Sequence, residues 1–108
     1  MKGDNEVFAA PVGRFRLAPV HPGKTLATEL ATRQLSARAL ALKLRVPANR
    51  ISEIIDGKRA ISPETALRLG RYFATGAAFW LNLQSQYDLA IAEAELGKRI
   101  AAEVEQPA

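Results

Sequence analysis

Cysteine is absent from this chain of 108 residues, and histidine occurs only once. The lack of cysteine excludes disulfide bonds and thiolate metal sites, and a single histidine cannot form a metal cluster. No apolar run approaches the length of a membrane span, and the N-terminus lacks the apolar core of a signal peptide. We therefore expect a cytoplasmic protein that needs no metal or other cofactor.

Patterns typical of enzymes and of β-sheets are also missing. The chain shows no nucleophile–base pair, no paired carboxylates and no Gly-rich phosphate loop, which leaves an enzyme as the least favoured function. It contains no repeats, no low-complexity segments and no strand-like alternation. Hydrophobic residues make up 48% of the sequence, so one domain of this length can bury a core. The predicted fold class is all-α.

Residues 36–59 predict two short amphipathic helices joined by a tight turn, with Ser36 as the N-cap of the first helix. Apolar residues recur at i, i+3, i+4 and i+7 in the first helix, namely Ala37, Leu40, Ala41 and Leu44. The second helix has its own apolar face, formed by Val46, Ile51, Ile54 and Ile55. Only Arg45-Val46-Pro47 separates the two runs, which sets the helices steeply across each other. This is a helix-turn-helix, and its second helix points at the major groove of duplex DNA.

The outer face of this predicted recognition helix carries the candidate base-reading residues. They are Ala48, Asn49, Arg50, Ser52 and Glu53. Asparagine can pair with adenine through two hydrogen bonds, arginine can do the same with guanine, and Ala48 can contact a thymine methyl group. Glu53 can accept from cytosine, or it can hold Arg50 or Arg45 in an ion pair. Both roles for Glu53 stay open at this point.

Basic charge is concentrated on the helix-turn-helix. Between residues 24 and 59, eight Lys and Arg face three acids, a charge of +5, whereas four bases face six acids from residue 60 onward, a charge of −2. A phosphate-binding surface requires such a local excess of positive charge. The predicted phosphate contacts lie at the start of the first helix and in the loop after the second: Ser36, Ala37, Arg38, Lys58 and Arg59.

Capping signals predict three further helices. One starts at Pro22 and ends near residues 33–34, and another starts after Ser62 with Pro63 in its first turn. The last runs from about residue 77 to 88 or beyond, after a break that ends at Gly76. Gly57 follows the recognition helix, where a left-handed residue is favoured.

These signals divide the chain into three parts. We expect a flexible arm over residues 1–20, a DNA-binding domain over residues 21–92, and a solvated helical tail over residues 93–108 that Gly97 interrupts. The helix from residue 77 carries more apolar surface than so small a domain can bury, which suggests a partner surface. Pairing of two chains doubles the DNA site, so we predict a homodimer whose interface contains Trp80, Leu83 and Tyr87.

Three segments, HPGKTLATEL, ISEIIDGKRAIS and PETALRLGRYFATGAAFWLNLQSQYDL, occur in this order and carry a family resemblance. Over about residues 20–92 the chain resembles the HigA family of addiction-module antitoxins, within the Cro/C1-type (XRE, lambda-repressor-like) helix-turn-helix class. The resemblance implies a five-helix dimer that represses its own operon at a palindromic operator and neutralises a HigB-type mRNA-cleaving toxin. By position, residues 48–53 match the base-reading segment and Lys58-Arg59 match the loop that contacts the DNA backbone.

Arg45 is a departure from the family pattern. The turn of such motifs usually has Gly where this chain has Arg45, which costs roughly 1 kcal/mol if φ is positive.

A free-standing repressor without a toxin partner is the alternative function, because no toxin-binding motif is recognisable. The toxin candidates are the arm, the first helix and the tail after residue 92. Within the arm they are Phe8, Phe15 and Leu17.

Overall fold

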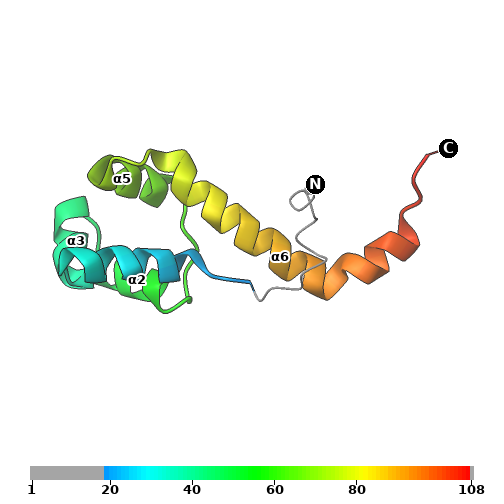
Figure 1. The fold of residues 1–108 in the computed structure, drawn as a ribbon, viewed down its shortest axis with the longest axis horizontal. Helices are drawn as coiled ribbons and strands as arrows, with labels where there is room; N and C mark the ends of the chain where they lie inside the picture. The colour runs from blue at the N-terminus through cyan, green and yellow to red at the C-terminus, as the bar shows by residue number, and fades with distance from the viewer. Residues whose placement is uncertain (1–18, 108) are drawn as a thin grey trace, which may run out of the picture.

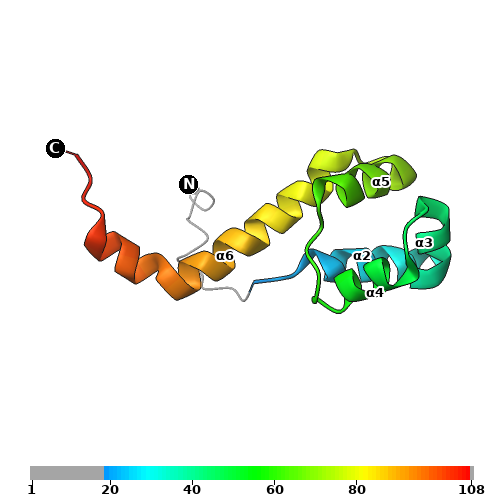
Figure 2. The same ribbon diagram turned by 180° about the vertical axis from the view of Figure 1, so that it is seen from behind.

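The computed structural model describes residues 19–107, and over this range the chain forms five helices and no strand. The helices are α2 (Pro22–Arg33), α3 (Ala37–Leu44), α4 (Ala48–Ile55), α5 (Pro63–Phe73) and α6 (Ala77–Glu103). Figures 1 and 2 show α2 to α5 gathered at one end of the molecule, while α6 runs away from them towards the C-terminus. The prediction of an all-α, five-helix fold is confirmed. The candidate toxin contacts in the arm lie outside the described residues.

Side-chain caps fix where three helices begin. Ser36 Oγ accepts from the Ala39 N–H at 3.0 Å at the start of α3, and Ser62 Oγ accepts from the Thr65 N–H at 3.2 Å at the start of α5. His21 Nδ1 accepts from the Gly23 N–H at 2.9 Å and so caps α2. Each cap satisfies a backbone donor that has no partner inside its helix, a contribution of about 1 kcal/mol. The sequence predicted the two serine caps, but not the histidine cap.

Left-handed residues end several helices. Gln34, Arg45 and Ala74 follow α2, α3 and α5 with φ of 55°, 61° and 60°. Gly57 after α4 has a φ of 76°, as its place in the sequence predicted. The condition under which Arg45 costs stability, a positive φ, is therefore met. A non-glycine residue in this region costs roughly 1–2 kcal/mol, which the surrounding contacts must offset.

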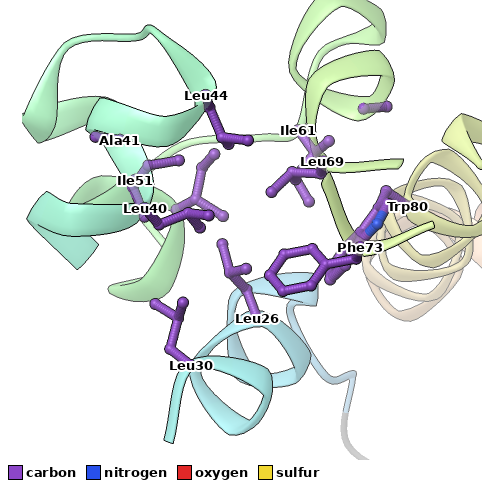
Figure 3. Packing of buried hydrophobic residues seen from close by; sticks show 12 residues of the cluster. Leu26, Leu30, Leu40, Ala41, Leu44, Ile51, Ile61, Leu69, Phe73 and Trp80 are labelled. Atoms are coloured by element: carbon purple, nitrogen blue, oxygen red, sulfur yellow. The ribbon is translucent and has the colours of Figure 1, made fainter. Parts of the chain in front are cut away.

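One hydrophobic core holds the helices together. Figure 3 shows Leu26 from α2, Leu40 from α3 and Leu69 from α5 pointing towards a common centre, with Phe73 and Trp80 side by side at its edge. Leu26, Leu40, Leu69 and Trp80 have no exposed surface. Truncation of such a residue to alanine typically costs 2–5 kcal/mol. The core therefore fixes the orientation of the helix-turn-helix on the other helices.

Gly23 marks a close approach between α2 and the recognition helix. A Cβ atom at this position would collide with the backbone carbonyl of Ile54. Only glycine lets the first turn of α2 pack this tightly against the end of α4. The glycine of the HPG segment therefore helps to hold the recognition helix in place.

Helix α6 is longer than the sequence predicted. It continues through Gly97 to Glu103, so Gly97 does not interrupt it. A glycine inside a helix costs about 1 kcal/mol relative to alanine, and the surrounding Ala, Glu, Leu, Lys and Arg residues favour the helix enough to offset this. No helix within residues 19–107 is long and apolar enough to cross a membrane.

Candidate nucleic-acid interface

The corner between α3 and α4 orients the recognition helix. The Val46 N–H donates to the Ala41 carbonyl at 3.0 Å, which closes the turn after the left-handed Arg45. Ala41 is 1% exposed and Ile51 is fully buried, so the small alanine side chain lets the two helices pack closely. Pro47 begins α4 without a side-chain cap. The first backbone N–H groups of α4 are therefore available to an external acceptor.

The predicted base-reading residues lie on α4 opposite its buried isoleucines. Ala48, Asn49 and Ser52 are exposed, and Arg50 and Glu53 are half-buried. Ile51 and Ile54 have no exposed surface and attach the other face of α4 to the core. A rigid helix thus presents one row of short and hydrogen-bonding side chains to solvent, the arrangement that groove reading requires.

Glu53 connects the recognition helix to the loop that follows it. Its Oε1 accepts from Arg59 Nε at 2.8 Å, and its Oε2 accepts from Asn49 Nδ2 at 3.3 Å. The hydrogen bond from Arg59 is the main cause that lowers the pKa of the Glu53 carboxyl. The sequence left open an ion pair of Glu53 with Arg50 or Arg45 as one of two roles. The partner is Arg59, because the turn at Gly57 brings the loop back towards α4.

Arg50 is held by a different carboxylate. Its NH1 donates to Glu64 Oε1 at 3.4 Å, and Glu64 Oε2 accepts from Arg68 Nε at 3.1 Å and NH2 at 3.0 Å. Arg68 NH1 also donates to the Leu44 carbonyl at 2.9 Å. This chain of contacts links Arg50 to α5 and to the end of α3. No local pattern in the sequence indicates this link, because its members lie on three different helices.

The predicted phosphate contacts lie at two places. Ser36 and Arg38 are exposed at the first turn of α3, where Ala37 is half-buried. Lys58 and Arg59 are exposed between α4 and α5. Helix α3 packs against α4, and Lys58 and Arg59 follow the end of α4 in the chain. Backbone N–H groups and cationic side chains at these two places can donate hydrogen bonds to the phosphates of a DNA backbone.

Gln84 is a buried polar residue that the sequence analysis did not single out. It is 6% exposed, its Oε1 accepts from the Ile61 N–H at 2.7 Å, and its Nε2 donates to Asp88 Oδ1 at 2.9 Å. The bond to Ile61 ties the loop between α4 and α5 to α6. The only sequence signal is that Gln84 lies one helical turn after Trp80 and one before Asp88, on the inner side of α6.

The residues predicted for the dimer interface fall into two groups. Trp80 has no exposed surface in the single chain and packs against Phe73 and Phe79, with ring centroids 5.7 and 5.1 Å apart. It is a core residue and offers no surface for a partner to touch. Leu83 and Tyr87 are half-buried, and the Tyr87 ring meets the edge of His21 at a centroid distance of 4.9 Å. These two retain surface that a partner chain can cover.

The fold and the α4 face together define a DNA-binding domain of the Cro/C1 helix-turn-helix class. Residues 27–80 match the helix-turn-helix family model. The chain is 46% identical over 87 residues to virulence-associated protein I of Dichelobacter nodosus, covering 80% of this chain and 81% of that protein.

Two solved structures are similar over most of their length. An addiction-module antidote protein of a HigA family from Coxiella burnetii is 44% identical, with a TM-score of 0.82 and coverage of 84% of this chain and 100% of that chain. The Pseudomonas aeruginosa antitoxin HigA, solved with the higBA promoter, is 47% identical with a TM-score of 0.81, over 83% and 99% of the two chains. The chain belongs to the helix-turn-helix family and, within it, to the HigA family of addiction-module antitoxins. This is a family of DNA-binding proteins and not a class of enzymes.

Proposed function

We propose that this chain is a sequence-specific antitoxin that represses its own operon as a homodimer and neutralises a HigB-type mRNA-cleaving toxin. The observation that carries the DNA-binding part is the outer surface of α4, where exposed Asn49 and half-buried Arg50 reach solvent while Ile51 and Ile54 are fully buried on the other face. The similarity to a HigA antitoxin solved with its promoter supports the same conclusion.

In this proposal α4 enters the major groove. Asn49 pairs with adenine and Arg50 with guanine, while Ala48, Ser52 and Glu53 contact neighbouring base edges. The start of α3, from Ser36 to Arg38, binds the DNA backbone on one side of the groove. Lys58 and Arg59 bind it on the other. These phosphate contacts supply affinity, and the α4 contacts supply selectivity.

The dimer forms through α6 in this proposal. Besides Leu83 and Tyr87, the helix exposes Leu89 and Ile100 with relative exposures of 66% and 47%. Apolar residues exposed along a helix that projects from its own domain favour a protein contact. One helix-turn-helix alone reads too few base pairs to select an operator. A two-fold contact presents two recognition helices to the two halves of a palindromic operator.

Two assays test the proposal separately. Fluorescence anisotropy with the promoter upstream of the chain's own gene, against a shuffled duplex of the same length and composition, tests sequence-specific repression. We expect at least a thousandfold preference for the promoter. Equal affinity for both duplexes refutes it.

Growth rescue of cells that express the adjacent toxin gene tests neutralisation. We expect the wild-type chain to restore growth, and a variant with both Asn49 and Arg50 changed to Ala to restore it equally, because the DNA-reading face must stay free in a repressing complex. Specific promoter binding without any rescue would identify a free-standing repressor instead.

A further inference from the structure

Two residues proposed to contact DNA share one carboxylate in the free protein. Arg59 Nε and NH2 both lie 2.8 Å from Glu53 Oε1, and Asn49 Nδ2 lies 3.3 Å from Glu53 Oε2. The side chains of Arg59 and Glu53 are 44% and 38% exposed, so this cluster lies at the surface, on the face proposed to meet DNA. The Arg59 guanidinium and the Asn49 amide, proposed to bind a phosphate and a base, are therefore both hydrogen-bonded to Glu53 before DNA binds.

The negative charge of the Glu53 carboxylate weakens DNA binding unless a base donates a hydrogen bond to it. A DNA phosphate that approaches Arg59 comes close to this negative charge, and it must also compete with Glu53 for the same guanidinium group. In the major groove, however, the amino groups of cytosine and adenine are donors that a carboxylate can accept. A matching site gives Glu53 such a donor and frees Arg59 for the backbone, whereas a mismatched site leaves the carboxylate facing acceptors.

We infer that Glu53 is a specificity-determining residue that withholds Arg59 from the backbone of non-matching DNA and releases it when a base amino group replaces the arginine. Glu53 thereby couples base reading to phosphate binding, and it acts more by weakening binding to wrong sequences than by strengthening binding to the operator. This inference rests on the proposed DNA-binding function.

The second carboxylate near α4 does not have this role. Glu64 accepts from Arg50, but it also accepts two hydrogen bonds from Arg68, which stays attached to the Leu44 carbonyl. Its charge is therefore compensated within the protein when Arg50 turns towards a base. Glu53 has no comparable second guanidinium among its hydrogen-bond partners within residues 19–107. The contrast assigns positioning of Arg50 to Glu64 and discrimination to Glu53.

The test compares Glu53→Gln with the wild-type chain on the promoter duplex and on a shuffled duplex across a salt series. Affinity for the shuffled duplex should rise roughly two- to fivefold, the range that the loss of one exposed ion pair allows. On this duplex alone, the slope of log K against log salt should steepen by about 0.9, because Arg59 gains one phosphate contact. The preference for the promoter should fall by the same two- to fivefold factor.

Two further variants separate this coupling from a simple change of net charge. Glu95→Gln makes the same charge change on an exposed position of α6 and should leave both affinities unchanged. In an Arg59→Ala background, Glu53→Gln should no longer raise the affinity for the shuffled duplex. An undiminished rise in that background, or an unchanged promoter preference in the single variant, overturns the inference while leaving the proposed function intact. Absence of any promoter preference in the wild-type chain overturns both.

Discussion

Replacing Gln84 with alanine tests how the loop after the recognition helix is held. The Gln84 side chain supplies the acceptor for the Ile61 N–H at 2.7 Å, and Ile61 itself is only 2% exposed. Without Gln84 this buried N–H group has no partner, a cost of roughly 1–3 kcal/mol. The second bond, to Asp88, is only partly buried and adds less. We expect the free energy of unfolding to fall by about 2 kcal/mol, and Tm to fall by roughly 10 °C.

Urea and thermal unfolding followed by circular dichroism measure this effect. Gln86→Ala is the matched control, because Gln86 lies two residues further along α6 and is exposed. The control should change Tm by no more than about 2 °C, as expected for a surface substitution. If the Gln84 variant is as stable as the Gln86 variant, the bond to Ile61 does not hold the loop and the reasoning is refuted.

Three further substitutions test the fold, the DNA contacts and the dimer. Ala74→Gly should raise the free energy of unfolding by about 0.5–1 kcal/mol in urea, since φ there is 60° and glycine adopts it without strain; a loss of stability would contradict this. Changing Lys58 and Arg59 together to alanine should weaken binding to all duplexes and reduce the salt slope by about 0.9 for each lost phosphate contact, which means both residues on the promoter but Lys58 alone on a shuffled duplex; an unchanged slope on the promoter removes the loop from the interface. Tyr87→Ser should shift a dimer towards monomer in sedimentation, and a folded variant that stays fully dimeric would place the interface elsewhere.

Much of the fold could be predicted from local signals. Ser36 and Ser62 cap helices because a hydroxyl at this position reaches the N–H three residues on, and Gly57 is left-handed because glycine has no Cβ. These effects depend only on neighbouring residues, so the sequence displays them. The length of α6 was underestimated, because Gly97 lowers helix stability without ending the helix.

Contacts between distant residues could not be predicted in the same way. Gln84 meets the backbone of Ile61 across 23 residues, and Arg50 meets Glu64 across 14. Nothing in the spacing of these residues indicates the partner, because the packing of whole helices decides which side chains meet. For the same reason Trp80 was predicted at a surface although the core encloses it completely. An apolar stripe shows that a helix buries one face, but not which residue of the stripe lies deepest.

The central claim is that the outer face of α4 reads DNA sequence, and a variant with both Asn49 and Arg50 changed to alanine tests it most directly. The measurement is the ratio of affinities for the promoter duplex and a shuffled duplex at one salt concentration. Each bidentate base contact contributes about 1–3 kcal/mol of discrimination, so this ratio should fall by roughly a hundredfold or more. Affinity for the shuffled duplex should change little, since the phosphate contacts remain. A variant that stays folded and keeps the wild-type ratio would contradict the account.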